Sequence, residues 1–258
     1  MGETFEVLMS CMHQTDFHLA KALDGQGVSV LLVNQCDTDA QQMTRLGNLR
    51  MLNTPTRGLS VSRNLAIENA QADVCLISDD DEWFVDNLQE TILEQYRLHP
   101  EADILIFKMI DRPARLGLKE KRLKGLDFLK VGSWQISFRR QSVLDCGARF
   151  DPKLGAGSGN GVNEENKFLK DCMKAGLTAV YVPVEIASAV RTSSTWFRSF
   201  DATYFYNRGR TTRYLLGMPL AIPYAFYFLF AKRNKYKNDI SPGKALAAIL
   251  KGIFAQKI

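Results

Sequence analysis

The chain has 258 residues, of which 46% are hydrophobic and 24% are charged. This length and balance are typical of a folded protein with a sizeable core, and they exclude a largely disordered chain. The formal net charge of +5 is too small to indicate nucleic-acid binding, so no nucleic-acid partner is expected.

The first half of the chain alternates between predicted strands and helices. Apolar runs predict strands at 5–10, 28–33, 49–52, 73–77 and 103–107, and the segments between them predict helices at 16–23, 58–70 and 86–98. Asp86 is the expected N-cap of the last helix. This alternation predicts an α/β fold with a mostly parallel sheet flanked by helices. Such sheets bind ligands at the carboxyl ends of their strands.

The next part of the chain is less regular. A basic stretch at 111–130 predicts a mobile connection, and a strand and a short helix are expected at 134–139 and 141–146. Alternating glycines at 155–161 predict a flexible loop. A helix is expected at 163–175, with Gly176 just past its end, and then a strand at 178–182 that closes at Pro183.

From about residue 193 the chain becomes helical, aromatic and basic. A helix is expected at 196–216, and the eighteen residues 214–231 carry no charge. That run approaches the roughly 20 residues needed to cross a bilayer, but Pro219 and Pro223 interrupt it and its aromatic side chains suit an interface. Four cations follow at once: Lys232, Arg233, Lys235 and Lys237. We therefore predict that residues 193–258 form a helical extension that lies on a membrane, with a membrane span at 214–231 as the alternative.

The cysteines and the N-terminal sequence together predict the cellular compartment of the protein. The five cysteines include no C-x-x-C pair, and an odd number without paired spacing indicates reduced thiols. No basic-then-apolar leader opens the chain, so export is not expected. These features predict a cytoplasmic protein, associated peripherally with the cytoplasmic membrane through its extension.

The strand at 73–77 leads into four consecutive carboxylates: Asp79, Asp80, Asp81 and Glu82. Adjacent negative charges repel one another and call for a counter-charge. A divalent cation such as Mn²⁺ or Mg²⁺ supplies one and prefers these oxygen ligands. The alternative is a solvated acidic turn that caps the next helix, and spacing alone does not decide between them.

Arg63 and Asn64 lie in the first turns of the helix at 58–70. This end of a helix favours anions, and a guanidinium can hold a phosphate through two hydrogen bonds. Alternatively, Arg63 tethers a carboxylate across the sheet. In both cases Arg63 and the acidic run should lie on the same side of the sheet.

Two blocks of the sequence resemble the family 2 glycosyltransferases: GLSVSRNLAIENAQADVCLISDDDEW and GNGVNEENKFLKDCMKAGLTAVYVP. The resemblance extends in pattern over residues 5–190. It implies the GT-A fold, a Mn²⁺ or Mg²⁺ cofactor and an inverting reaction. No Q-x-x-R-W motif follows, Trp196-Phe-Arg198 being the nearest sequence, which favours addition of a single sugar over synthesis of a polymer.

The resemblance also implies which residues bind the nucleotide-sugar: Asn34, Arg63, Asn64, Asp79, Asp80 and Asp81. Within this set Asp79 and Asp81 match the metal-binding pair, and Asp81 is the expected direct ligand. Asn34 stands where the family often has an aspartate that reads the base. This is a departure from the family pattern: an amide can still hydrogen-bond uracil, and a UDP-sugar is the expected donor, but Asn34 leaves the identity of the nucleotide open.

On the acceptor side, the resemblance implies that Glu165 is the catalytic base, with Glu164 beside it. Trp134 stacks on an acceptor sugar or fills core. Residues 1–110 are then the donor-binding half of a catalytic domain that ends at 192, and residues 111–192 are its acceptor half. The basic, aromatic extension favours a saccharide or lipid-linked saccharide acceptor, as in cell-surface polysaccharide synthesis.

Two other functions remain alternatives at this point. A nucleotidyltransferase also uses metal-binding carboxylates on an α/β sheet, but it needs a Gly-rich basic loop near the first strand, which the sequence lacks. A non-catalytic, membrane-docked protein that binds sugar nucleotides would bind donor without turnover. Association into a homo-oligomer is also left open.

Overall fold

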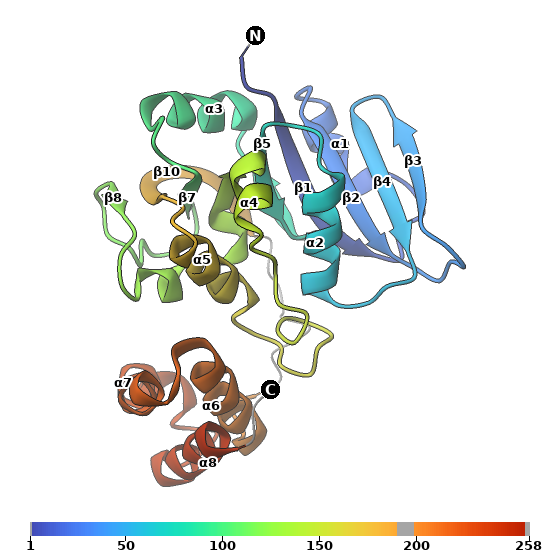
Figure 1. Cartoon of the computed structure of the whole chain (residues 1–258). Helices are drawn as coiled ribbons and strands as arrows, with labels where there is room; N and C mark the ends of the chain where they lie inside the picture. Colours follow the sequence, from blue (N-terminus) through green and yellow to red (C-terminus); the bar gives the residue numbers. More distant parts are fainter. Residues whose placement is uncertain (1, 190–198, 256–258) are drawn as a thin grey trace. The chain divides into compact units, whose positions relative to one another are not determined.

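In this computed structural model, the structure describes residues 2–189 and 199–255. The chain forms two compact units (Figure 1). The first comprises Met1–Pro152 and Glu165–Arg191, and the second comprises Lys153–Glu164 and Thr192–Ile258. The segment Lys153–Glu164, expected to belong to the acceptor half, therefore groups with the C-terminal helices. Trp196 and Arg198 lie outside the described residues.

The first unit is built on one mixed sheet of ten strands within the described residues. Its order is β3-β4-β2-β1-β5-β9-β7-β10-β6, with β8 pairing to β10 outside this path. The strands are β1 (Phe5–Met12), β2 (Ser29–Gln35), β3 (Gln42–Leu46), β4 (Leu49–Thr54), β5 (Val74–Ser78), β6 (Glu82–Phe84), β7 (Ile104–Met109), β8 (Lys121–Arg122), β9 (Ile136–Arg139) and β10 (Ala179–Ala189).

Four neighbouring strands, β4, β2, β1 and β5, run parallel, so their carboxyl ends meet at one edge of the sheet. β9 pairs antiparallel with both β5 and β7, and it therefore starts at that same edge. The helices and turns of this unit are η1 (His18–Ala20), α1 (Lys21–Asp24), α2 (Leu59–Asn69), α3 (Leu88–Leu98), η2 (Asp127–Lys130), η3 (Ser133–Gln135), α4 (Arg140–Cys146) and α5 (Glu164–Lys174). The expected α/β fold, a central sheet between helices, is confirmed.

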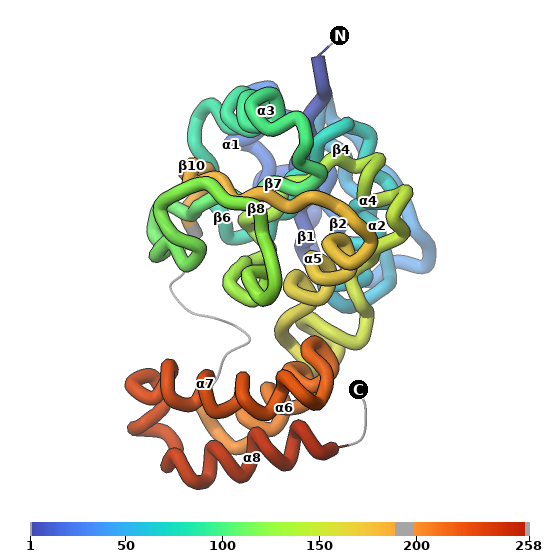
Figure 2. Tube along the Cα trace, turned by 60° about the vertical axis from the view of Figure 1, so that its left-hand side comes forward, coloured from blue at the N-terminus to red at the C-terminus, as the bar shows by residue number. Residues whose placement is uncertain are grey.

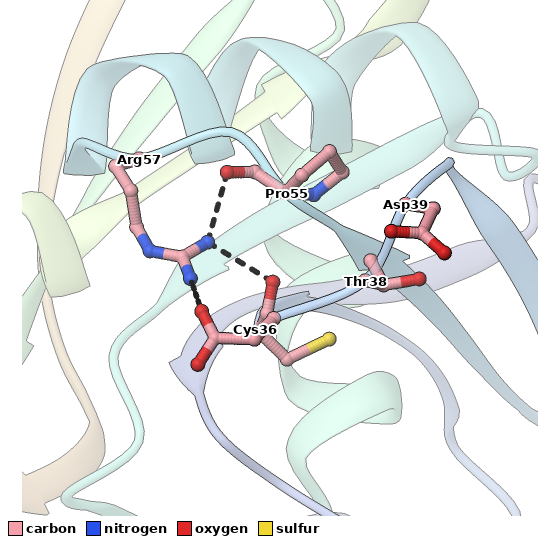
Figure 3. Close-up of a pocket in the computed structure, with 6 residues that line it drawn as sticks. Cys36, Thr38, Asp39, Pro55 and Arg57 are labelled. Atoms are coloured by element: carbon pink, nitrogen blue, oxygen red, sulfur yellow. Dashed lines mark hydrogen bonds and ion pairs between the residues drawn. The ribbon is translucent and has the colours of Figure 1, made fainter.

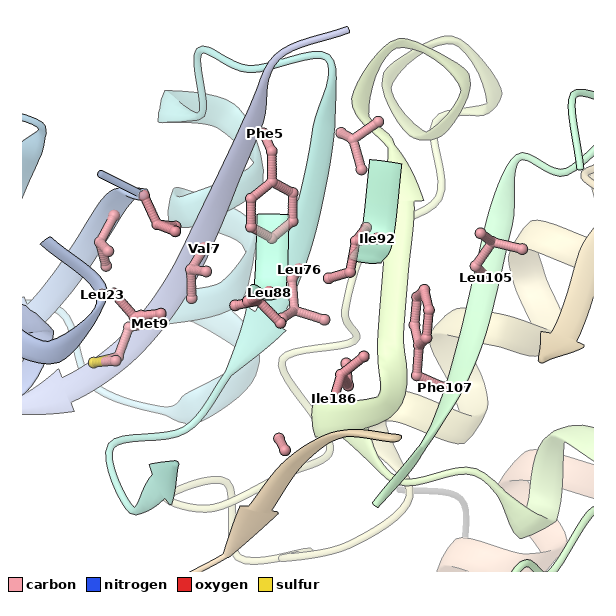
Figure 4. Close-up of a cluster of buried hydrophobic side chains, with 14 of the residues drawn as sticks. Phe5, Val7, Met9, Leu23, Leu76, Leu88, Ile92, Leu105, Phe107 and Ile186 are labelled. Carbon is pink, nitrogen blue, oxygen red and sulfur yellow. The ribbon is translucent and has the colours of Figure 1, made fainter. Parts of the chain in front are cut away.

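The two faces of the sheet bury alternate side chains of each strand, as a pleated strand requires. On one face, Val7 and Met9 of β1 pack with Leu23 of α1 and with Leu88 and Ile92 of α3 (Figure 4). On the other face, the hydroxyl of Ser62 in α2 donates to that of Ser10 in β1 at 2.9 Å. Both faces of the central strands are therefore covered, which explains their nearly continuous apolar sequences.

A buried ion pair ties β1 to β4 and to the end of α2. A terminal nitrogen of Arg50 donates to Oε1 of Glu6 at 2.6 Å, and the other donates to the carbonyl of Asn69. The second oxygen of Glu6 accepts from the amide of Gln71. Because every partner is hydrogen-bonded, the two charges are tolerated inside the protein.

Three sequence expectations for individual elements were wrong. β10 does not end at Pro183 but continues to Ala189, with its register shifting between Tyr181 and Glu185, where the proline can donate no ladder hydrogen bond. Asp86 is not the N-cap of α3: that residue is Asn87, and no side chain caps the helix. The helix expected at 16–23 is a short turn followed by the single turn of α1.

Two segments expected to be mobile or flexible are organised by hydrogen bonds. Asp127 accepts from the side chains of Lys121 and Lys130 and from the amide of Lys124, and it anchors the basic stretch. In the glycine loop, Gly155 and Asn160 form a bridge, and three glycines supply positive φ angles at 155, 157 and 159. Glycines there allow a tight turn because they adopt this backbone conformation without strain.

The second unit contains α6 (Ala202–Leu216), α7 (Met218–Tyr236) and α8 (Pro242–Phe254), which Figure 2 shows packed on one another. Their core is rich in aromatic rings and includes Phe205, Phe228 and Tyr236. α6 and α8 touch backbone to backbone: a Cβ on Gly252 would lie 2.0 Å from the carbonyl oxygen of Tyr206. None of the helices in the described residues is both long and apolar enough to span a membrane.

Candidate active site

The acidic run lies at the carboxyl edge of the sheet, between β5 and β6. Asp79 is partly exposed and accepts a hydrogen bond from a terminal nitrogen of Arg63 at 2.8 Å. Its other oxygen accepts from the hydroxyl of Ser133 at 3.4 Å. Arg63 and the acidic run therefore share one side of the sheet, as expected.

Arg63 is buried, with 1% of its side chain exposed. Its guanidinium lies 5.4 Å from the ring centroid of Phe150, and that ring stacks on Phe168 of α5. A side chain this deeply buried is badly placed to grip a phosphate with two hydrogen bonds. The alternative reading, that Arg63 tethers a carboxylate, describes the geometry, and Asp79 is the tethered group.

Like charges crowd the rest of the run. Partial burial and the charges of Asp79 and Asp81 raise the pKa of Asp80. Both carboxyl oxygens of Glu82 are buried, and burial, followed by the charge of Asp79, raises the pKa of Glu82 well above its usual range. A cation placed against this run would relieve the repulsion.

The start of α5 belongs to the same edge. The side-chain amide of Asn166 donates to the carbonyls of Phe128 and Val131 at 2.8 and 3.0 Å. Ser133, two residues after Val131, makes the hydrogen bond to Asp79. These contacts hold the first turn of α5, including Glu165, to the segment that touches the acidic run.

The two glutamates at this helix start differ in burial. Glu165 is half-buried, whereas Glu164 is 7% exposed. The residue before them, Asn163, has φ 75, and its side-chain amide donates to the hydroxyl of Thr211 in α6. Asparagine tolerates this left-handed conformation better than most residues.

Asn34 is fully buried at the end of β2 and its amide is already used. Its Nδ2 donates to the carbonyl of Gln14 at 2.7 Å and to Oδ1 of Asn53 at 2.8 Å, and its Oδ1 accepts from the amide of Gln14. Both N–H donors are therefore occupied. In this geometry Asn34 fixes the backbone that follows β1, and a base could contact it only by displacing these partners.

Asn64 is likewise engaged. Its amide nitrogen donates to the carbonyl of Phe150 and its oxygen accepts from the amide of Phe150, both at 2.8 Å. Asn64 therefore joins α2 to a segment 86 residues later in the chain. Direct donor binding by Asn64 remains a prediction, whereas its structural tether is evident.

A cavity of about 590 Å³ opens at the carboxyl ends of β2 and β4 (Figure 3). Arg57 pairs with Asp37 at 2.5 Å and donates to the carbonyls of Cys36 and Pro55, so it fastens two neighbouring loops together. The lining is polar and comes from Cys36, Asp37, Thr38, Asp39, Pro55 and Arg57. Sequence reasoning did not single out these residues, because only the parallel pairing of β2 and β4 brings them together.

Two tryptophans flank this edge. Trp134 is half-buried against the sheet core, with its ring folded over Gly132 and 5.9 Å from the guanidinium of Arg112. Trp83 follows the acidic run directly and is 60% exposed. An exposed indole next to carboxylates is a candidate sugar-stacking surface that sequence reasoning missed, although its place two residues after Asp81 was a usable signal.

A family model described as glycosyl transferase family 2 matches residues 10–145. This match covers more than half of the chain. The chain belongs to glycosyl transferase family 2. It is a glycosyltransferase, and the nucleotidyltransferase alternative has no support from this match. No curated protein sequence matches the chain.

Solved structures share the fold. S. aureus TarS 1–349 in complex with UDP-GlcNAc is similar with a TM-score of 0.63 and 15% identity, over 97% of this chain and 81% of that one. The mannosyltransferase PcManGT from Pyrobaculum calidifontis, in complex with GDP-Man and Mn²⁺, is similar with a TM-score of 0.55 and 14% identity, over 98% and 74% of the two chains. These similarities confirm the expected GT-A fold.

Proposed function

We propose that this family 2 glycosyltransferase transfers a single sugar from a UDP-sugar to a hydroxyl group with inversion, in a reaction that needs Mn²⁺ or Mg²⁺. The observation that supports this proposal is the network from Asp79 through Ser133 and Val131 to Asn166, because it joins the segment that touches Asp79 to the first turn of α5, which carries Glu165. TarS was solved with UDP-GlcNAc and UDP, which supports a uridine donor. The cavity beside Arg57 is the place we propose for the nucleoside.

The acidic run at the carboxyl edge of the sheet, which we call the acidic edge, fits a divalent cation. It consists of Asp79, Asp80, Asp81 and Glu82. They offer hard carboxylate oxygens, and the pKa of Asp80 is raised first by burial and then by the charges of Asp79 and Asp81. Asp81 is the proposed direct ligand, as the resemblance implies, and Asp79 is the carboxylate that accepts hydrogen bonds from Arg63 and Ser133. The described residues contain no group of three metal-ligating side chains, and Mg²⁺ sites of this kind are completed by substrate phosphates. When bound, the ion would neutralise charge on the departing diphosphate.

Glu165 is the proposed base. Its carboxylate accepts the proton of the acceptor hydroxyl while the acceptor oxygen forms a bond to the anomeric carbon. The bond from that carbon to the diphosphate breaks, and UDP leaves with the electron pair. Attack from the face opposite the leaving group inverts the anomeric centre. Glu165 suits this task better than Glu164 because it is half-exposed and can reach an acceptor.

The proposed acceptor is a saccharide or a lipid-linked saccharide in cell-surface polysaccharide synthesis. The basic and aromatic C-terminal unit supports a location at the cytoplasmic face of a membrane, where such acceptors are assembled. Trp134 and the exposed Trp83 are the candidate surfaces for its sugar rings. Nucleic acid is not among the proposed partners.

The glutamates provide the test. We expect Glu165→Gln to lower the rate of UDP release with acceptor by about 10²-fold or more, the scale of general-base catalysis, while leaving UDP binding in Mn²⁺ unchanged by calorimetry. Glu164→Gln is the matched control and should retain more activity. Asp81→Asn should behave oppositely, losing the Mn²⁺-dependent part of UDP binding.

Unchanged turnover in Glu165→Gln would refute its role as base. Donor binding by the wild-type chain without any sugar transfer, across a panel of UDP-sugars and acceptors, would favour the non-catalytic binding protein instead.

A further inference from the structure

One face of α7 is apolar and exposed, although the helix already buries its opposite face. Ala221, Ala225 and Phe228 pack into the core of the C-terminal unit. The exposed residues recur every three or four residues, which places them along one side of the helix. We name them the α7 stripe: Leu220, Pro223, Phe226, Tyr227 and Phe230.

The α7 stripe is unusual for a surface in contact with water. Tyr227 is 65% exposed and Phe230 is 85% exposed, and no charged residue interrupts the stripe. Contiguous exposed apolar surfaces of this kind mark binding sites. Two aromatic side chains next to each other, one with a hydroxyl, suit the boundary between lipid tails and headgroups.

Positive charge lies at the end of the stripe. Arg233, Lys235 and Lys237 are exposed in the last turn of α7 and just after it, and neither α7 nor α8 contains an aspartate or glutamate. A second copy of the chain would bring like charges together at the interface. An anionic lipid surface instead lets the aromatic rings enter the apolar region beneath the headgroups, and its negative headgroups attract the cations.

We propose that the α7 stripe docks α7 flat onto an anionic phospholipid surface, with Arg233 and Lys237, which follow the stripe on the same side of the helix, on the headgroups. This inference deepens the proposed function, because it supplies the surface on which a lipid-linked acceptor would be met. The membrane contact is then one face of α7, whereas the sequence predicted only that residues 193–258 lie on a membrane.

The test is sedimentation of the full chain with vesicles of phosphatidylcholine alone or mixed with phosphatidylglycerol. The wild-type chain should bind the anionic vesicles, and salt should weaken the binding. The combined variant Phe226→Ser, Tyr227→Ser and Phe230→Ser should bind about a hundredfold more weakly. The combined variant Arg233→Gln and Lys237→Gln should lose about 25-fold, since each cation near such a surface contributes about fivefold.

A matched control removes equally exposed apolar side chains from the first unit, through Leu46→Ser, Leu98→Ser and Leu118→Ser. This control should bind like the wild type, and circular dichroism should show that every variant is folded. Equal binding by the aromatic variant, or no binding by the wild type, would overturn the proposal. A wild-type dimer that the aromatic variant dissociates would do so too, because the stripe would then be a self-interface.

The vesicle assay contains neither donor nor acceptor, so its result does not depend on the proposed chemistry. Glu165→Gln should bind vesicles like the wild type. Failure of docking and failure of glycosyl transfer are therefore seen separately.

Discussion

Arg63 and Asn64 are adjacent in the sequence, yet the folded chain gives them different partners. Arg63 holds Asp79 at the acidic edge, and Asn64 holds the backbone of Phe150. Helical geometry explains the difference, since consecutive residues point about 100° apart around the axis. The two residues therefore serve different purposes. Arg63 fixes a carboxylate of the candidate site, and Asn64 fixes the backbone of Phe150, whose ring lies against the guanidinium of Arg63.

Asn64→Ala should destabilise the protein without weakening donor binding. The change removes two hydrogen bonds and leaves the amide and carbonyl of Phe150 without these partners, which costs about 1–3 kcal/mol. Urea denaturation measures the loss, and calorimetry with UDP and Mn²⁺ measures the affinity. A large loss of UDP affinity in folded Asn64→Ala would instead restore the donor-binding role.

At the scale of elements, the continuation of β10 past Pro183 gives β6, the strand that begins at Glu82, its pairing partner. β6 pairs antiparallel with the end of β10, and this pairing fixes the chain that leaves the acidic run. A proline is usually a reason to end a strand. Here the register shifts around it, and the strand resumes on the far side. The pairing with β6 therefore depends on a partner more than 100 residues away in the sequence.

The crossing of α6 and α8 depends on glycine. A Cβ on Gly209 would lie 2.1 Å from the carbonyl oxygen of Ile249, and one on Gly252 would meet the backbone of Tyr206 and Arg210. Backbone atoms cannot move aside as a flexible side chain does. These glycines thus allow a close approach that no other residue permits.

Gly252→Ala should therefore lower the stability of the C-terminal unit by about 1–3 kcal/mol or more, the cost of overpacking. Gly243→Ala in the same helix is the matched control, because a Cβ there meets nothing within 4 Å. The control should be neutral or slightly stabilising, since alanine favours helix. Thermal denaturation followed by circular dichroism measures both, and equal midpoints for the two variants would show that the helices can separate without cost.

At the scale of the whole molecule, each unit has a hydrophobic core of its own. The first is a sheet core with α1 and α3, and the second is the aromatic core of α6 to α8. The proposed site residues Asp79, Asp81 and Glu165 belong to the first unit, and the α7 stripe belongs to the second. Chemistry and docking are therefore assigned to different units of one chain.

This separation predicts how the acceptor's location matters. With a water-soluble acceptor, the combined Phe226→Ser, Tyr227→Ser and Phe230→Ser variant should release UDP at the wild-type rate. With an acceptor embedded in anionic vesicles, it should be slower by about the factor lost in vesicle binding, because docking raises the local concentration of acceptor. Equal loss with both acceptors would mean that the stripe also supports the catalytic unit.

The sequence by itself determined the α/β class, the acidic edge and the side on which Arg63 lies. Those features follow from local patterns: apolar periodicity, short-range spacing and the rule that parallel strands end together. The prediction that Gly176 lies just past the end of α5 also rested on local sequence, and its positive φ of 99° is typical of a glycine in that position. A resemblance to family 2 glycosyltransferases supplied the roles of the carboxylates.

Only the tertiary structure decided which side chains are still available to a ligand. Asn34, Arg63 and Asn64 use hydrogen-bonding groups on Gln14, Asp79 and Phe150, which lie 20, 16 and 86 residues away from them in the sequence. The cavity beside Arg57 and the pairing of β6 with β10 also depend on residues that only the tertiary structure brings together. A buried polar group must find a partner wherever the fold brings one, and sequence distance carries no information about that encounter.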